Sequence, residues 1–225
     1  MGQSAHQPGP IFITGASGYV GSRLVPRLLE RGYEVRALAR KESTAKLPAG
    51  CRIIEGDPLD SRTFAEEVSG ADTFVQLVGV AKPAPWKGPT FRTIDLVSAR
   101  ASIEAATAAG VKHFIYVSVA HPAPIMQAYI AVRRVCEEAI RAAGMPATLI
   151  RPWYILGPGH RWPLLLLPAY KIMELIPSTS EAARRLGLVA IDDMLAALVW
   201  AIERPPSDVR VIDVPEIRRL GKNAR

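Results

Sequence analysis

The sequence contains few cysteines and no hydrophobic run long enough to cross a membrane. Of its 225 residues, only Cys51 and Cys136 are cysteines, and neither lies in a metal-ligand spacing, which argues against a disulfide framework and a zinc site. No apolar run reaches the roughly 18 residues that span a bilayer. Residues 1–10 lack the apolar core of a signal peptide, and His6 stands where a myristoylation motif requires Ser or Thr. We therefore expect a soluble, cytoplasmic protein with a loose tail over residues 1–10.

Acidic residues are fewer than basic ones, but the difference does not indicate nucleic-acid binding. The formal net charge is +7, from 28 Lys and Arg against 21 Asp and Glu. The basic residues are scattered, and no arginine–aromatic cluster or nucleic-acid motif is present, so we expect no nucleic-acid partner. An anionic cofactor and a solvated surface explain the excess. The length suits one domain with a substantial core and leaves room for a small second lobe.

Three glycines spaced three residues apart interrupt the first hydrophobic run, where residues 11–21 read IFITGASGYVG. If the first four residues form a buried strand, Gly15 permits a tight turn, Gly18 lets the backbone approach a pyrophosphate, and Gly21 allows close helix packing. A helix over residues 22–31 and the strand after it would complete a βαβ unit. Its N-terminus would offer N–H groups to phosphates. This pattern predicts a dinucleotide site formed by Gly15, Ser17, Gly18, Tyr19, Val20 and Gly21.

Strands and helices alternate as far as residue 156. Further strands are expected over residues 33–40, 51–56, 72–80, 111–120 and 147–156, with helices over 61–70, 91–110 and 127–144 and a proline-rich loop over 81–90. This alternation predicts an α/β fold with a doubly wound parallel sheet, a Rossmann fold, over residues 11–156. From Gly157 the chain becomes rich in proline and leucine, followed by a helix over 191–204 and a short strand over 209–214. We expect residues 157–225 to form a small substrate lobe packed on the core.

These motifs resemble those of the short-chain dehydrogenase/reductase superfamily in its extended and atypical branches. TGASGYVG is similar to the TGxxGxxG cofactor turn of those branches, and GDPLD to their adenine-contacting segment. The resemblance implies an NAD(P) cofactor, with Asp57 and Pro58 at the adenine, Val78 and Gly79 along the adenosine, and Pro152 beside the nicotinamide. The likeness is greatest to atypical members related to the complex I accessory subunit and to NmrA-like proteins.

The end of the second expected strand bears on the choice between NADP and NAD. An NAD site usually offers a carboxylate to the ribose about 20 residues beyond the glycines, whereas an NADP site offers arginine to the 2′-phosphate. Arg40 and Lys41 occupy that place, which favours NADP. In the alternative, Arg40 is a solvated strand end and Glu42 binds the ribose of NAD.

Tyr129 and Arg133 occupy the positions of the superfamily's tyrosine and lysine. Residues four apart share one helix face, and in the superfamily the lysine lowers the tyrosine pKa and holds the ribose. Arginine keeps the positive charge but cannot give up a proton, so electrostatic help survives while a proton relay is in doubt. Ser118 is the candidate for the superfamily's serine, although that serine usually lies a little further along. Tyr129 is then the candidate general acid.

Six other residues near this end of the sheet have structural explanations that compete with functional ones. They are His121, His160, Trp153, Tyr154, Asp192 and Asp193. The histidines fit loops, and the aromatic pair fits either the core or a pocket wall. The two aspartates resemble the capped start of a helix rather than a metal pair, so we expect no metal.

Three functions fit these residues. The leading hypothesis is an NADP(H)-dependent oxidoreductase that transfers hydride to or from a small organic carbonyl-type substrate, apolar ones included, while Tyr129 exchanges a proton with the substrate oxygen. The alternative is a non-catalytic NAD(P)H-binding regulatory or accessory protein, a redox sensor or assembly partner. Arg133 in place of lysine favours this alternative, as does the lack of a serine a little beyond Ser118. An isomerase or epimerase fits less well, since such members generally need the intact tyrosine and lysine.

Overall fold

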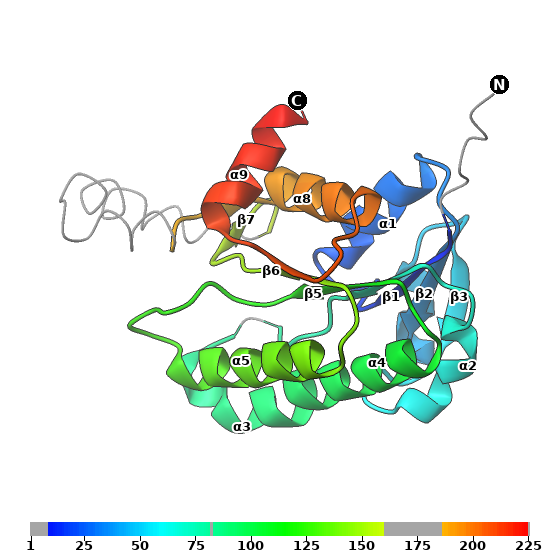
Figure 1. The fold of residues 1–225 in the computed structure, drawn as a ribbon, viewed down its shortest axis with the longest axis horizontal. Coiled ribbons are helices and arrows are strands. Elements are labelled where there is room, and N and C mark those ends of the chain that lie inside the picture. The colour runs from blue at the N-terminus through cyan, green and yellow to red at the C-terminus, as the bar shows by residue number, and fades with distance from the viewer. Residues whose placement is uncertain (1–8, 82, 160–185, 225) are drawn as a thin grey trace.

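A seven-stranded sheet, in which every neighbouring pair is parallel, forms the centre of the molecule (Figure 1). The computed structural model describes residues 9–81, 83–159 and 186–224. In sequence order the strands are β1 (Ile11–Thr14), β2 (Val35–Ala39), β3 (Arg52–Glu55), β4 (Thr73–Gln76), β5 (His113–Val117), β6 (Ala147–Ile150) and β9 (Val209–Ile212). Their spatial order is β3-β2-β1-β4-β5-β6-β9. The chain adds β2 and β3 on one side of β1 and then continues with β4 on the other side. The predicted doubly wound parallel sheet is confirmed.

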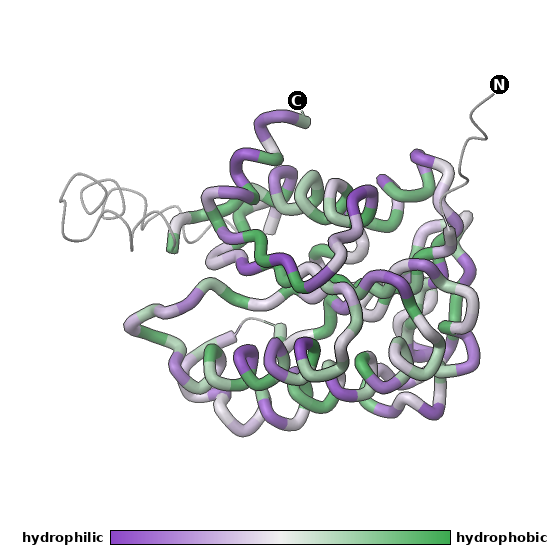
Figure 2. Tube along the Cα trace, in the orientation of Figure 1, coloured by the Kyte–Doolittle hydropathy of each residue, from purple (hydrophilic) through white to green (hydrophobic). Residues whose placement is uncertain are grey.

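Helices cover both faces of this sheet (Figure 1). One face carries α1 (Gly21–Leu29), α8 (Ile191–Glu203) and α9 (Val214–Asn223), and the other carries α2 (Ala65–Val68), α4 (Val97–Ala108) and α5 (Gln127–Ala142). Figure 2 shows hydrophobic residues along the central strands and α8. The molecule is therefore a three-layer α/β/α sandwich with a hydrophobic core on each side of the sheet.

The two cores follow from the alternation of side chains along each strand. Ile11 and Ile13 of β1 enter the core under α1 and α8, whereas Phe12 enters the core under α4 and α5. The Phe12 and Phe74 rings lie 5.2 Å apart between centroids, and the Phe74 and Phe114 rings 5.3 Å apart. This row of aromatic side chains crosses three neighbouring strands and fixes their register.

Two predicted segments differ from the observed ones. Helical structure begins within the expected loop, as the 3₁₀ turn η3 (Pro85–Lys87), then α3 (Gly88–Thr90), the π-helical η4 (Phe91–Leu96) and α4. The first turn of a helix tolerates proline. The proline-rich composition of residues 81–90 therefore did not exclude a helix in this segment. The helix expected over 61–70 is instead the 3₁₀ turn η2 (Ser61–Thr63) followed by the single turn α2, and a further 3₁₀ helix, η1 (Lys41–Lys46), follows β2.

The strand expected in the carboxyl-terminal lobe belongs to the central sheet instead. β9 pairs in parallel with β6, from Ala147 opposite Val209 to Ile150 opposite Ile212. It follows α8, which covers the sheet, and a crossover of this kind returns the chain to the next position in the same sheet. In the main sheet, the strand expected over 147–156 ends at Ile150.

Beyond Ile150 a separate two-stranded sheet forms, in which β7 (Ile155–Leu156) pairs with β8 (Val189–Ala190). Residues 1–8 of the loose tail predicted for residues 1–10 lie outside the described residues, as do His160 and the rest of the predicted lobe's middle over 160–185. Among the helices that the structure describes, none combines the length and the apolar character that a membrane span requires.

Candidate functional site

The glycine-rich turn lies between β1 and α1, at the carboxyl edge of the sheet. Gly15 has a φ of 74°, and a Cβ there would lie 2.8 Å from the Leu77 carbonyl carbon. A Cβ at Gly21 would overlap the turn itself, around Ala16. A Cβ at Gly18 would meet the Gly15 oxygen at 3.1 Å and otherwise open space among the described residues. Packing within the chain thus accounts for Gly15 and Gly21, whereas Gly18 faces outward, where a ligand can approach.

The start of α1 suits an anion. In the described part of the chain no side chain caps this helix, and its first turn holds no acidic residue. Arg23 lies in that turn, with Nη1 donating to the Tyr19 carbonyl at 2.8 Å and its guanidinium carbon 4.2 Å from the Tyr19 ring centroid. Helix N–H groups, the positive end of the helix dipole and one arginine fit the charge of a dinucleotide pyrophosphate.

The carboxyl ends of β2, β3 and β4 place Arg40, Asp57 and Val78 at the same edge. Arg40 follows β2 directly, and its Nε lies 3.2 Å from Glu42 Oε1 in a pair whose side chains are 63% and 65% exposed. Asp57 follows β3, where its Oδ1 accepts the Leu59 N–H at 3.0 Å. Val78 follows β4. Because parallel strands end at one edge, these residues and the glycine turn share one side of the molecule.

Arg133 is held by three protein groups on two other elements. Its Nη2 lies 2.6 Å from Asp95 Oδ1 in η4, and its Nη1 donates to the Tyr116 hydroxyl and the Val117 carbonyl of β5, both at 2.9 Å. The Asp95 side chain is fully buried, and its Oδ2 accepts the Val80 N–H at 3.2 Å. Burial raises the pKa of Asp95 above the ordinary carboxyl value, and the Arg133 guanidinium opposes that rise.

Gly79 makes room for this ion pair. A Cβ at Gly79 would lie closer than 3.0 Å to Arg133 Nη2 and 3.1 Å from Asp95 Oδ1. The chain's own arginine therefore requires a glycine at a position that sequence reasoning assigned to the adenosine. Sequence reasoning missed Asp95 itself. A signal was present, because Asp95 stands three residues before Ser98 and seven before Ser102 on the buried stripe of its helix.

Tyr129 lies in the first turn of α5, close to the carboxyl end of β5. It packs against apolar residues of both cores, as a residue at the edge of the sheet does. Its ring centroid lies 4.9 Å from that of Phe91 and 5.0 Å from the Arg133 guanidinium carbon. Burial raises the pKa of Tyr129 above the ordinary value of 10.0, and Arg133 offsets this rise only in part. Tyr129 and Arg133 share one face of α5, as their spacing predicts.

Ser118 follows β5, and its hydroxyl is engaged within the protein. Its Oγ donates to Glu137 Oε1 at 2.6 Å, and the residue is 3% exposed. Glu137 also accepts the Arg151 Nε–H at 2.9 Å, and His121 Nε2 lies 3.7 Å from its Oε1. Burial raises the pKa of Glu137, but the hydrogen bonds from Arg151 and Ser118 outweigh burial and leave that pKa below the ordinary value. A substrate would compete with Glu137 for the Ser118 hydroxyl.

The chain after β6 forms the remaining wall of this edge. Pro152 is buried, and its carbonyl accepts the Ala120 N–H at 2.9 Å, which ties the segments after β5 and β6 together. The Trp153 and Tyr154 rings meet edge to face with centroids 5.3 Å apart. Among the described residues, no group of three or more potential ligands could hold a metal ion.

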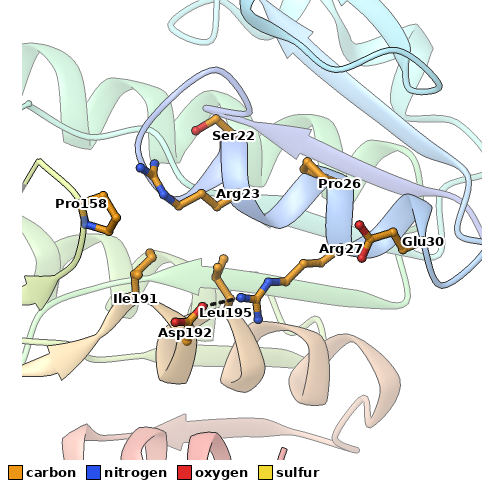
Figure 3. Close-up of a pocket in the computed structure, with 9 residues that line it drawn as sticks. All are labelled: Ser22, Arg23, Pro26, Arg27, Glu30, Pro158, Ile191, Asp192 and Leu195. Carbon is orange, nitrogen blue, oxygen red and sulfur yellow. Dashed lines mark hydrogen bonds and ion pairs between the residues drawn. The ribbon is translucent and has the colours of Figure 1, made fainter. Parts of the chain in front are cut away.

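A groove of about 440 Å³ lies between α1 and α8 (Figure 3). An ion pair between Arg27 and Asp192 crosses it, so Asp192 pairs with α1 rather than capping α8, for which no side-chain cap is recorded among the described residues. The groove adjoins the first turn of α1 through Ser22 and Arg23, and the other residues that line it are Pro26, Arg27, Glu30, Pro158, Ile191, Asp192 and Leu195. Its lining contains none of the candidate catalytic residues, and we assign no chemistry to it.

The fold and the glycine-rich turn define a dinucleotide-binding protein of the Rossmann class. A family model described as NAD(P)H-binding matches residues 15–160, and the chain belongs to this family, within the atypical short-chain dehydrogenase/reductase superfamily. Ceramide reductase of Caulobacter vibrioides is 31% identical over 215 residues, which are 95% of this chain and 66% of that protein. This chain therefore spans slightly less than two thirds of that reductase.

Two further comparisons agree with this class. The uncharacterized sugar epimerase YhfK of Bacillus subtilis is 26% identical over 222 residues, 92% of this chain and 94% of that protein. The structure of MoeE5 in complex with UDP-glucose and NAD has a TM-score of 0.69 at 19% identity and covers 96% of this chain and 82% of that one. The structural likeness supports the fold, and the family model supports binding of a nicotinamide cofactor.

Proposed function

We propose that the protein is an NADP(H)-dependent oxidoreductase that transfers a hydride to or from the carbonyl carbon of a small organic substrate. The observation that carries this proposal is the position of Tyr129 in the first turn of α5, on one face with Arg133 and at the edge that holds the glycine-rich turn. The sequence similarity to a ceramide reductase over 95% of this chain supports reduction as the direction and an apolar substrate as the class.

Each part of the cofactor has residues suited to it. In the proposal, the turn from Gly15 to Gly21 and the start of α1 bind the pyrophosphate. Asp57 and Pro58 would border the adenine, and Val78 and Gly79 would border the adenosine. Pro152 would lie beside the nicotinamide. The bound cofactor supplies or accepts the hydride, while the chain orients the substrate and moves the proton at the Tyr129 hydroxyl.

Arg40 supports NADP over NAD as the preferred cofactor. Its side chain is 63% exposed at the carboxyl end of β2, and arginine binds phosphate through charge-assisted hydrogen bonds. Glu42, whose Oε1 lies 3.2 Å from Arg40 Nε, is the group that would bind the ribose hydroxyls of NAD in the alternative. Titration of both cofactors into the wild-type protein separates the two, and equal or tighter binding of NADH would contradict the NADP proposal.

The test of the proposed function is turnover of a Tyr129→Phe variant. NADPH consumption is measured with a panel of aldehydes, ketones and quinones, long-chain ones included. We expect the rate to fall by about 10²- to 10⁴-fold, because this change removes the proton donor, while NADPH affinity changes little. Tyr33→Phe is the matched control, since Tyr33 lies between α1 and β2 at the opposite edge of the sheet. Turnover that survives Tyr129→Phe would contradict the catalytic assignment.

A non-catalytic NAD(P)H-binding role is the second candidate. It is favoured by the engagement of Ser118 with Glu137 and of Arg133 with Asp95, because both side chains already have partners inside the protein. Tight cofactor binding with no turnover on any substrate would support this role. The name of YhfK raises an epimerase as a third candidate, but arginine replaces the lysine that such members generally need. We also propose a cytoplasmic location, in keeping with two free thiols at Cys51 and Cys136.

A further inference from the structure

The charge of Arg133 is matched by a carboxylate that comes from a different element of the chain. Arg133 is 4% exposed and Asp95 is fully buried. The two atoms that face each other, Nη2 and Oδ1, are 2.6 Å apart. The other guanidinium end-nitrogen, Nη1, is bound to the Tyr116 hydroxyl and the Val117 carbonyl. The guanidinium is thereby bound on both sides and turned toward β5 and η4.

This arrangement changes what Arg133 does to the phenol next to it. The Arg133 guanidinium carbon lies 5.0 Å from the centroid of the Tyr129 ring, close enough for an uncompensated charge to stabilise a phenolate. The carboxylate of Asp95 lies against the same guanidinium and has the opposite effect on the Tyr129 hydroxyl. The two formal charges sum to zero, so the repulsion that the Asp95 carboxylate exerts on a Tyr129 phenolate offsets part of the attraction from the Arg133 guanidinium.

We propose that Asp95 is a positioning residue that keeps Tyr129 a proton donor, by binding the Arg133 guanidinium in a buried ion pair and so offsetting part of its charge. The inference rests on the proposed oxidoreductase function and specifies its direction. The chain is a carbonyl reductase at neutral pH, and alcohol oxidation, which needs the Tyr129 phenolate as base, requires alkaline pH.

This arrangement favours carbonyl reduction, in which the hydride and the proton both come from groups already named. The carbonyl carbon of the substrate would be reduced by the hydride that a bound reduced nicotinamide supplies, which leaves the nicotinamide oxidised. The O–H bond of Tyr129 breaks as its proton passes to the carbonyl oxygen, where the O–H bond of the alcohol forms. The resulting phenolate recovers a proton from water.

The titratable and charged groups around Tyr129 come from three described elements. α5 contributes Arg133 and Cys136, and η4 contributes Asp95. β5 contributes Tyr116, whose own pKa burial raises well above the ordinary value. Cys136 and Tyr116 are neutral at pH 7, so Asp95 is the group whose removal changes the charge balance at Tyr129 most directly.

The experiment is a spectroscopic pH titration of the Tyr129 phenol in the full chain, without cofactor or substrate. Absorbance of tyrosinate is recorded for the wild type and for Asp95→Asn, and the same curves from Tyr129→Phe versions of each are subtracted to isolate Tyr129 from the other five of the six tyrosines. We expect Asp95→Asn to lower the Tyr129 pKa by at least about one unit. Glu137→Gln, which alters the other buried ion pair of α5, is the matched control and should leave this pKa unchanged.

Two further variants keep the test decisive if Asp95→Asn folds poorly. Arg133→Met leaves the carboxylate alone and should raise the Tyr129 pKa. The double variant Asp95→Asn with Arg133→Met carries no charge at either position and should return the Tyr129 pKa toward the wild-type value. An unchanged or higher Tyr129 pKa in folded Asp95→Asn, or a lower one in Arg133→Met, would overturn the inference.

Turnover supplies a second readout that separates this inference from the proposed function. In Asp95→Asn the alkaline limit of kcat/KM for carbonyl reduction should move to lower pH by the same shift that the titration shows. An alkaline limit that stays in place while the Tyr129 pKa falls would overturn the inference. Failure to reduce any substrate in the wild type would contradict the proposed function, while the titration would still decide whether Asp95 compensates Arg133.

Discussion

Replacing Gly79 by alanine tests whether this glycine serves the buried ion pair or a bound cofactor. The added Cβ would lie closer than 3.0 Å to Arg133 Nη2 and 3.1 Å from Asp95 Oδ1. The guanidinium has little freedom to move away, because Nη1 is fixed by the Tyr116 hydroxyl and the Val117 carbonyl. Alanine at this position must therefore displace either the backbone after β4 or the ion pair.

The loss of stability expected in Gly79→Ala lies between two limits. Overpacking a tight site costs about 1 to 3 kcal/mol, and breaking a buried ion pair by removing one partner costs about 3 to 5 kcal/mol. Alanine distorts the pair without removing a charge, so we expect the free energy of unfolding to fall by about 2 to 3 kcal/mol. If Gly79 were needed only for the close approach of a cofactor, Gly79→Ala would leave the free energy of unfolding of the cofactor-free protein unchanged.

Urea unfolding of the cofactor-free protein measures the difference by linear extrapolation. Gly88→Ala is the matched control, because a Cβ at Gly88 would meet the Ala128 Cβ at an ordinary 3.5 Å and its helical backbone suits alanine. In an Arg133→Met background, the cost of Gly79→Ala should shrink by about 1 kcal/mol or more, since contacting residues couple. A Gly79→Ala protein within about 0.5 kcal/mol of the wild type would refute the role given to this glycine.

Two further predictions concern cofactor choice and pH. Arg40→Asp should weaken NADPH binding by about ten- to a hundredfold while sparing NADH, as measured by fluorescence titration of both cofactors; equal losses for both would count against a 2′-phosphate contact. Burial lowers the pKa of His113 from 6.5 to about 4, so the unfolded chain binds the proton more readily, and the free energy of unfolding should fall by about 3 kcal/mol as the pH drops from about 6.5 to about 4. A His113→Phe variant should lack this slope in urea unfolding across that range, and a slope that persists in it would assign the pH dependence to other groups.

The sequence by itself determined the features that depend on residues close together in the chain. The alternation of apolar strands and amphipathic helices was enough for the doubly wound sheet, because those patterns report which face of each element is buried. The spacing of Gly15, Gly18 and Gly21 was enough to predict the turn, although the close approach of Gly15 to Leu77 of a neighbouring strand end appears only in the tertiary structure. The four-residue spacing of Tyr129 and Arg133 likewise placed both on one face of α5.

Tertiary structure alone decided which partners those side chains take. Arg133 pairs with Asp95, 38 positions earlier, and Ser118 with Glu137, 19 positions later. It also placed β9 beside β6 in the central sheet. The physical reason is that a buried charge or hydroxyl must find a partner among whatever groups the packed elements bring within hydrogen-bond distance. Local sequence limits which residues can be buried, but only the packed elements bring Asp95 and Arg133 together and offset part of the charge next to Tyr129.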